Sequence, residues 1–254
     1  MAYLAGCMEK KSKWSRAWRI VKRTFLVLFI AQFLYIILLK WVDPPITLTQ
    51  LFSWISGDGL ARDYVRYDEM SYNAKLAVIA SEDQIFPDHS GFDWKSIEKA
   101  MNYNKKKPGR IHGVRGASTI SQQVAKNVFL WQGRDWVRKG LEVYFTKMIE
   151  WIWGKQRILE VYLNVIEMGR GVFGVEAAAQ KYFGKPAISL NRREGAMIAA
   201  CLPNPKVFTI KPAHPHVVVR SGQIMRQMSN LEGDPDVQRI IQIAKPTVVK
   251  KKAV

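Results

Sequence analysis

The chain has 254 residues, which is enough for one sizeable domain with attached segments. A hydrophobic content of 48% permits a packed core and excludes a wholly disordered chain. The formal net charge of +18 favours a polyanionic partner, either nucleic acid or the anionic headgroups of a bilayer. Charge alone does not decide between the two.

The first predicted element is an apolar helix from residue 24 to about residue 39, in which Gln32 is the one strongly polar side chain. Extended to Trp18 and Trp41, the helix spans about 36 Å and can cross a hydrocarbon core of about 30 Å. Tryptophans are typical of membrane interfaces. The alternatives are a buried core helix and a cleaved signal peptide, but the bulky residues that follow offer no small-residue cleavage site. We expect an uncleaved transmembrane signal anchor at residues 24–42.

The charges in front of this helix predict its orientation. Residues 1–23 carry seven lysines and arginines against one acid, Glu9. The positive-inside rule therefore keeps residues 1–23 in the cytoplasm and exports the rest of the chain, which argues against nucleic acid as a partner. Cys7 and Cys201 then lie on opposite sides of the membrane, so no disulfide is expected. No His/Cys cluster has metal-ligand spacing.

After the anchor, proline residues end the helix and a membrane-proximal segment, residues 43–70, follows. It either lies against the bilayer or covers the main domain, and the sequence leaves both readings open. Helical periodicity dominates from there to about residue 230, which predicts an all-α domain. The loop at 104–115 is basic, and is either a mobile solvated segment or a flap. His214 and His216 are expected in a loop, and the end of the chain in a loose basic tail. Helices are expected at 75–80, 96–103, 119–130, 135–152, 155–167, 175–183 and 191–201.

The first segment with candidate catalytic residues surrounds Glu82. This residue is expected at the C-terminal end of a helix, where the negative end of the helix dipole disfavours the charged form of its carboxylate. If the side chain is also partly desolvated, its pKa rises toward the range of a general base. The alternative is a solvated acidic pair, Glu82 and Asp83, in front of a loop.

The second segment begins at Gly116, a glycine that allows the backbone a wide range of conformations. A helix capped by Ser118 or Thr119 follows it. A helix N-terminus with hydroxyls and a lysine on one face suits an anion such as diphosphate. The alternative is a capped amphipathic helix with a solvated face. The polar face carries Thr119, Gln122, Gln123 and Lys126.

The third segment, residues 134–169, places Arg138 and Glu142 four residues apart on a helix. This spacing is typical of a surface ion pair, which contributes little, but it also suits a carboxylate held by a cation at a cleft. The following helix begins near Lys155 and Arg157, with Asn164 two turns further on. A charged solvent-exposed face is again the alternative.

Taken together, these segments resemble the peptidoglycan glycosyltransferases of family 51 over roughly residues 65–230. Size and the single anchor are similar to those of monofunctional members in Gram-negative bacteria. Residues 71–231 are then the catalytic domain and 232–254 the tail. Ser96 and Lys99 match a bare SxxK pattern, which we interpret as noise. The resemblance rests on Glu82-Asp83-x-x-Phe86-x-x-His89-x-Gly91, Gly116-x-Ser118-Thr119-Ile120-x-Gln122-Gln123-x-x-Lys126-Asn127, Arg138-Lys139-x-x-Glu142, Arg157-Ile158-Leu159-x-x-Tyr162-Leu163-Asn164, Gly169-x-Gly171-x-x-Gly174, and Leu202-Pro203-Asn204-Pro205.

The resemblance implies a lysozyme-like helical fold and polymerisation of lipid II, with inversion at the donor sugar and release of undecaprenyl diphosphate. By motif, Glu82 matches the general base and Glu142 a second essential carboxylate. Lys126 and Arg138 are the cations most strongly expected at the diphosphate. The substrate-binding positions are Ser118, Thr119, Gln122, Gln123, Lys126, Asn127, Arg138, Lys155 and Arg157, and those near the site are Asp83, Phe86, His89, Gly116 and Asn164.

Diphosphate is a competent leaving group, so the reaction needs cationic stabilisation rather than a general acid. Basic side chains supply it, and a divalent cation, Mg²⁺ or Mn²⁺, is compatible without being obligatory. The expected partners are lipid II, the glycan chain on undecaprenyl diphosphate, the bilayer of the inner membrane, and other cell-wall synthases and division proteins. The rival readings are a lytic enzyme of the same architecture and a non-catalytic scaffold or nucleic-acid binder.

Overall fold

The structure, a computed structural model, describes residues 2–106, 116–133 and 135–242, without the side chains of residues 2–13 and 106. It divides into two compact units, residues 1–42 and 43–254. The first unit holds helix α1 (Ala2–Leu38), whose segment Trp14–Leu38 is long and apolar enough to cross a membrane. Most of this segment is exposed, as expected of an anchor and not of a core helix.

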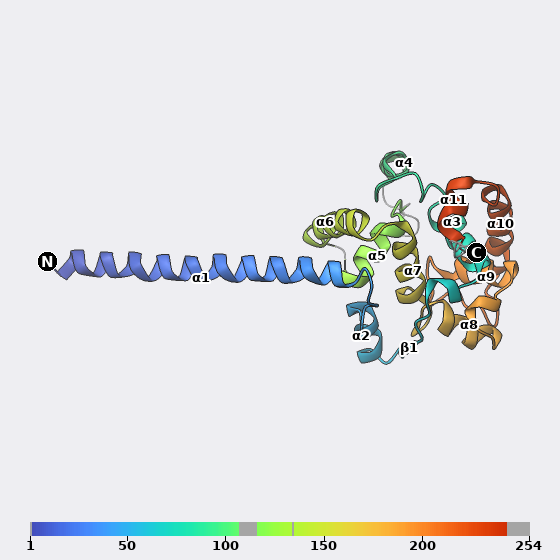
Figure 1. Cartoon of the computed structure of the whole chain (residues 1–254), viewed down its shortest axis with the longest axis horizontal. Helices are drawn as coiled ribbons and strands as arrows, with labels where there is room; N and C mark the ends of the chain where they lie inside the picture. Colours follow the sequence, from blue (N-terminus) through green and yellow to red (C-terminus); the bar gives the residue numbers. More distant parts are fainter. Residues whose placement is uncertain (1, 107–115, 134, 243–254) are drawn as a thin grey trace, which may run out of the picture. The chain divides into compact units, whose positions relative to one another are not determined.

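The second unit is built from helices, which confirms the all-α prediction (Figure 1). The seven helices expected between residues 75 and 201 correspond to α3 through α9, with ends within a few residues of those predicted for all but α3 and α4, which are longer. The helices are α2 (Leu48–Ile55), α3 (Tyr72–Glu82), α4 (Trp94–Lys106), α5 (Ile120–Phe129), α6 (Trp136–Ile152), α7 (Lys155–Val165), α8 (Val175–Phe183), α9 (Arg192–Cys201), α10 (Pro215–Leu231) and α11 (Pro235–Ile241), with 3-10 turns at Tyr67–Glu69 and Ala187–Ser189.

A small three-stranded sheet ties the segment after α2 to the centre of the chain. Its strands β1 (Ala61–Arg62), β2 (Glu167–Gly169) and β3 (Val172–Phe173) lie in the order β1-β3-β2, with β1 parallel and β2 antiparallel to β3. Gly171 makes the turn between β2 and β3 at φ +64°, and a Cβ there would lie 2.2 Å from the Asp58 carbonyl oxygen. Only glycine fits this approach.

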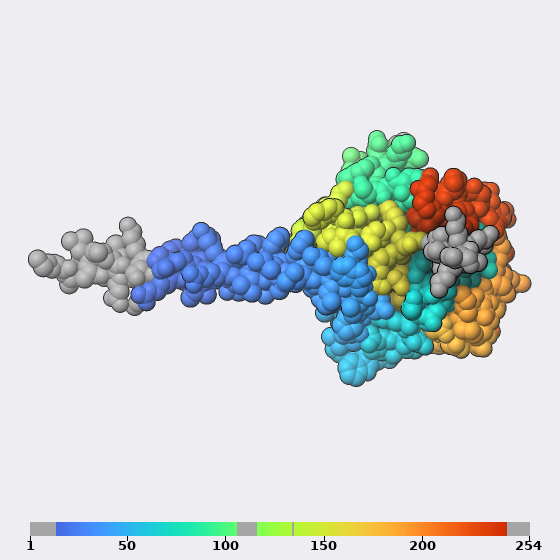
Figure 2. Space-filling model, in the orientation of Figure 1, coloured from blue at the N-terminus to red at the C-terminus, as the bar shows by residue number. Residues whose placement is uncertain are grey.

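The core surrounds α3, in which every residue from Ala74 to Ala80 is buried. Helix α3 packs against α9 and α10, while α5 packs against α6 and α7. The C-terminal end of α3 and the N-terminal end of α5 meet in this arrangement, because the buried Asp83 side chain accepts a hydrogen bond from the Ile120 backbone N–H at 3.0 Å. Figure 2 shows α4 (green) standing out from the surface above α6 (yellow).

Two expectations for the C-terminal part were wrong. His216 is not in a loop but in the first turn of α10, together with Pro215. His214 lies just before the helix and caps it, because its side chain accepts a hydrogen bond from the His216 backbone N–H at 3.1 Å. The tail is not loose up to residue 241, because Asp234 caps α11 and the side chains of α11 at 237, 240 and 241 are buried. Residues 104–106 of the predicted basic loop belong to α4 instead. The expectations for residues 107–115 of this loop and for residues 243–254 lie outside the described residues.

Candidate active site

A cleft of about 730 Å³ opens where α3 ends and α5 begins. It brings together six of the residues singled out in the sequence, and α4 and α10 supply further walls. The other predicted site residues do not line it: Phe86, His89, Gln122, Lys126, Asn127, Arg138, Glu142, Lys155, Arg157 and Asn164. The lining residues are Ser81, Glu82, Asp83, Gln84, Ile85, Asp93, Ser96, Lys99, Gly116, Ala117, Ser118, Thr119, Gln123, Pro203 and Arg220.

Glu82 is the last residue of α3, as predicted, and its half-buried carboxylate lines the cleft. One oxygen accepts a hydrogen bond from Gln123 Nε2 at 2.9 Å and the other from Ser81 Oγ at 3.4 Å. The Gln123 amide is itself oriented, because its oxygen accepts a hydrogen bond from the hydroxyl of the fully buried Tyr162 at 3.2 Å. Glu82 is therefore held by a chain of hydrogen bonds that reaches into the core.

Burial raises the pKa of Glu82 above its ordinary value, against the opposing effects of the Gln123 and Ser81 hydrogen bonds and of the positive charge of Arg220. Desolvation penalises the ionised form, so the carboxylate has a greater affinity for a proton than one in water. A carboxylate of this kind, facing an open cleft, suits a general base. Glu82 and Asp83 are therefore not the solvated acidic pair that the sequence also allowed.

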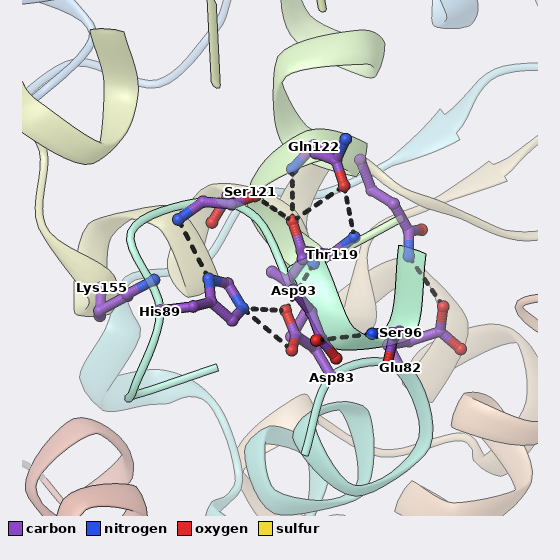
Figure 3. Close-up of polar contacts among 12 residues, drawn as sticks. Glu82, Asp83, His89, Asp93, Ser96, Thr119, Ser121, Gln122 and Lys155 are labelled. Atoms are coloured by element: carbon purple, nitrogen blue, oxygen red, sulfur yellow. Dashed lines mark hydrogen bonds and ion pairs between the residues drawn. The ribbon is translucent and has the colours of Figure 1, made fainter. Parts of the chain in front are cut away.

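The carboxylate next to it has a structural role. Asp83 is buried, and both of its oxygens lie 3.0–3.1 Å from His89 Nε2 (Figure 3). His89 Nδ1 accepts a hydrogen bond from the Gly91 backbone N–H at 3.0 Å, so Nε2 carries a proton and donates to Asp83. Because Asp83 also accepts from the Ile120 backbone N–H, it fastens the loop after Glu82 to the start of α5.

Thr119 and Gln122 form a capping box at the start of α5. Thr119 Oγ1 accepts from the Gln122 backbone N–H at 3.2 Å and donates to the Gly91 carbonyl oxygen at 2.8 Å, while the Gln122 side chain accepts from the Thr119 backbone N–H at 3.1 Å. Both residues are buried, and these bonds with the backbone engage the Thr119 hydroxyl and the Gln122 amide oxygen. Ser118, in contrast, is exposed in the cleft beside Gly116.

A second group of charges, the basic cluster, consists of Lys126, Arg138, Lys139 and Glu142. The buried Glu142 carboxylate lies 3.1 Å from Arg138 Nη1 and 2.5 Å from Lys139 Nζ. Burial lowers the pKa of Lys126; Glu142 opposes this shift, and the positive charges of Arg138 and Lys139 add to it. Three cations therefore surround one carboxylate, and the exposed surface ion pair that the sequence allowed is not what forms.

The basic cluster retains an unused donor. Arg138 is 8% exposed, and within the described part of the chain its Nε is buried without a hydrogen-bond partner. A buried donor without a partner is costly unless a ligand supplies the acceptor. Gln123 and Lys126 are three residues apart on α5, so the Glu82 cleft and the basic cluster share one face of that helix.

Two of the amides expected at the site hold the fold together instead. Asn127 donates to the Gln123 carbonyl oxygen at 2.8 Å and accepts from the Thr49 hydroxyl of α2 at 3.4 Å. Asn164 is fully buried and makes two hydrogen bonds with the backbone of Val65, at 3.2 and 3.0 Å. Both amides attach residues 43–70 to the helical core.

The two cations at the start of α7 also have protein partners. Lys155 Nζ pairs with Glu150 at 2.6 Å and lies 4.5 Å from the ring centre of the fully buried Phe86. Arg157 pairs with Asp43 at 3.0 Å and with Glu160 at 2.8 Å. These contacts give Lys155 and Arg157 structural roles in this structure.

The sequence did not predict Arg220, Lys139 or Pro203 as site residues. Arg220 is on α10. The buried side chains of this helix recur at 217, 221, 224 and 228, and this helical spacing could have predicted the helix that carries Arg220. Ser96 and Lys99, dismissed as a chance pattern, line the cleft as part of α4. No described group of three or more His, Cys, Asp or Glu side chains is arranged to hold a metal ion.

Comparison with known proteins places the chain in a family. The Transglycosylase family model matches residues 49–229. The chain is 46% identical over 228 residues to the biosynthetic peptidoglycan transglycosylase of Pseudomonas fluorescens Pf-5, which covers 87% of this chain and 93% of that relative. It is 53% identical over 193 residues to the Escherichia coli K12 (DH10B) and Shigella boydii serotype 4 proteins of that name, covering 75% of this chain and 78% of each relative. The chain thus belongs to the transglycosylase family and is a glycosyltransferase of peptidoglycan synthesis.

Proposed function

We propose that this enzyme polymerises lipid II into β-1,4-linked glycan strands and releases undecaprenyl diphosphate. The observation that carries the proposal is the position of the Glu82 carboxylate, whose pKa is raised by burial, in a cleft on the same face of α5 as the basic cluster. A base for a hydroxyl and cations for a departing anion are the two elements that such a transfer needs.

In the proposed step, Glu82 takes the proton from the 4-hydroxyl of the acceptor lipid II. The acceptor oxygen attacks the anomeric carbon of the donor N-acetylmuramic acid, on the face opposite the diphosphate. As the new carbon–oxygen bond forms, the bond to the diphosphate breaks and its electron pair leaves with the phosphate oxygen. A single displacement inverts the α-linked donor to a β bond, so no covalent enzyme intermediate is required.

The basic cluster would stabilise the negative charge that develops on the diphosphate. Lys126 and Arg138 carry this role, because Arg138 has an unused buried donor and Lys126 is held in a poorly solvated position. Glu142 orients Arg138 and Lys139 through its two carboxylate oxygens. A divalent cation on the substrate phosphates would add to the same stabilisation. Lys155 and Arg157 are secondary candidates, since they already have acidic partners.

The charge pattern supports a location in the bacterial inner membrane. The basic residues 1–23 favour a cytoplasmic N-terminus and a single crossing, with the catalytic unit in the periplasm. Other cell-wall synthases and division proteins are proposed partners there, and nucleic acid is not. Residues 71–231 would form the catalytic domain.

The rival is a lytic enzyme that cleaves existing strands, and one experiment separates the two. The purified full-length protein is incubated in detergent either with lipid II or with preformed glycan strands, and the products are digested with a muramidase. Synthesis predicts a polymer made from lipid II that the muramidase degrades, and intact preformed strands. Cleavage of the strands with no polymer from lipid II would reject the proposal.

A further inference from the structure

The hydroxyl of Tyr162 is a buried polar group to which the proposed reaction gives no part. Tyr162 lies on α7 with 0% of its surface exposed, so it does not touch a substrate in the cleft. Its hydroxyl donates to the amide oxygen of Gln123 at 3.2 Å, and among the described residues this oxygen is its only hydrogen-bond partner. A buried hydroxyl that lost this bond would be costly to the fold.

This bond decides which end of the Gln123 amide faces Glu82. The oxygen of a primary amide accepts and its nitrogen donates, so the two ends are not equivalent to a neighbour. With its oxygen bound to the Tyr162 hydroxyl, Gln123 presents Nε2 to the Glu82 carboxylate at 2.9 Å. A reversed amide would place its oxygen against the carboxylate and leave the Tyr162 hydrogen without an acceptor. The tyrosine therefore selects the orientation in which the amide donates to Glu82.

The hydroxyl is a permanent donor. Burial raises the pKa of Tyr162 well above its ordinary value of 10.0, and the acidic groups of Glu82, Cys201 and Asp83 add to the rise. Cys201 is on α9, whereas Glu82 and Asp83 are at the end of α3. Tyr162 therefore keeps its proton near neutral pH and does not change from donor to acceptor.

The bond from Gln123 favours the ionised form of Glu82. Burial raises the pKa of Glu82 and the charge of Asp83 adds to the rise, whereas Gln123, Ser81 and Arg220 lower it. Among these lowering effects, the hydrogen bond from Gln123 is the largest, and Arg220 of α10 contributes the smallest. Because a general base must be ionised to accept a proton, the orientation of one amide controls how much of the enzyme is active at a given pH.

We propose that Tyr162 is a positioning residue for the base: its hydroxyl fixes the Gln123 amide so that Nε2 holds the Glu82 carboxylate ionised in the cleft. Tyr162 acts through Gln123 alone and contacts no reacting atom. The inference rests on the proposed function, since it takes Glu82 as the base. It adds a side chain of α7 that controls a carboxylate of α3 through an amide of α5.

The pH dependence of kcat/KM for lipid II, measured in detergent on full-length Tyr162→Phe, tests the proposal. The change removes the hydroxyl and leaves the ring in the core. The acid limb should move to higher pH by about one unit, as expected when most of a hydrogen bond to a charged group is lost. Well below both midpoints the variant should be about tenfold slower, while KM stays within about twofold because no substrate contact changes. An acid limb at the same pH as in the unaltered enzyme would overturn the proposal.

Tyr67→Phe is the matched control. The Tyr67 hydroxyl also donates inside the protein, to the Ile240 carbonyl oxygen at 2.6 Å, but this bond does not lead to Glu82. The control should lower Tm, as Tyr162→Phe should, and leave the acid limb where it is in the unaltered enzyme. An equal shift in both variants would assign the effect to a loosened fold and reject the positioning role.

A double-mutant cycle tests whether Tyr162 acts through Gln123. Gln123→Met removes the amide and should move the acid limb at least as far as Tyr162→Phe does. Adding Tyr162→Phe to Gln123→Met should then move it by less than about 0.3 unit, and additive shifts would overturn the relay. If Tyr162→Phe does not fold, Gln123→Met alone decides, because an unmoved acid limb would show that the amide does not control the carboxylate.

Failure of this inference is distinguishable from failure of the proposed function. If the unaltered enzyme makes no polymer from lipid II, the proposed function is rejected. If it makes polymer and its acid limb does not respond to Tyr162→Phe, only the positioning role of Tyr162 is rejected.

Discussion

Replacing Glu82 with glutamine should produce an enzyme that is inactive and more stable. The amide keeps the size of the side chain, and its oxygen can still accept the hydrogen bond from Gln123. The change removes the proton acceptor, so polymerisation should fall by about 10²- to 10⁴-fold, the usual contribution of a general base. It also removes an ionised group from a poorly solvated position.

The stability gain has a definite pH dependence. Because burial raises the pKa of Glu82 in the folded state, the folded chain holds this proton more tightly than the unfolded chain. The stabilising effect of protonation is fully present when the pH is below 4.5, the pKa of this carboxyl group in the unfolded chain. It is lost as the pH rises through the pKa of the folded state. Each unit of the rise corresponds to about 1.4 kcal/mol. Near neutral pH, the free energy of unfolding of the variant should exceed that of the unaltered enzyme by about 1.4 kcal/mol for each such unit. Below about pH 4.5 the two free energies should be equal.

Two measurements check this prediction: lipid II turnover in detergent, and thermal unfolding between acid and neutral pH. For a domain of this size, 1 kcal/mol shifts Tm by about 2–4 °C. Glu98→Gln, the same change at an exposed position of α4, should alter neither activity nor the pH profile of Tm. Retained turnover would remove Glu82 as the base. A variant with unchanged or lower Tm near neutral pH would contradict the desolvation of its carboxylate.

Three further predictions follow from the contacts of individual side chains. Arg138→Ala should lower kcat/KM on lipid II by about 10²-fold or more, with partial recovery in Arg138→Lys; a lower Tm with unchanged activity would instead indicate a purely structural ion pair. Thr119→Ala should cost about 1 kcal/mol of unfolding free energy through the lost cap while KM stays constant, and a raised KM at unchanged Tm would assign Thr119 to the substrate. Burial lowers the pKa of Lys75 to about 8 from 10.5, so above pH 8 the unfolded chain binds a proton that the folded chain does not. Relative to Lys75→Met, the unaltered protein should therefore gain stability as pH rises from 8 to 10.5, and a constant difference in chemical denaturation would refute this.

The sequence predicted the helices with strong local signals. Helix α5 follows its capping residue Thr119, and α6 follows Asp135, so both were placed within a residue or two. Helix α11 was missed because three apolar residues in a short polar segment give little periodicity, although Asp234 and Pro235 are a recognisable start. The buried face of α2 could not be assigned from the sequence either, because this helix buries Gln50 and Ser53 and exposes Phe52 and Ile55, the reverse of the usual pattern.

The candidate site was predicted in part. The position of Glu82 at the end of α3 follows from local sequence, but the hydrogen bonds that hold it come from Gln123 and, through Gln123, from Tyr162, which lie on two other helices. Motif residues with different roles were indistinguishable in sequence. Gln122 and Gln123 are neighbours, yet one closes a helix cap and the other orients the carboxylate, because successive residues on a helix point in directions about 100° apart.

The central claim is that an ionised Glu82 accepts the proton of a sugar hydroxyl. The most direct measurement is the pH dependence of kcat/KM for lipid II polymerisation by the full-length enzyme in detergent. The account predicts that the rate falls toward acid with a midpoint above 4.5, since burial raises the pKa of this carboxylate and only its ionised form can accept the proton. A rate that stays level down to pH 4.5 would contradict it.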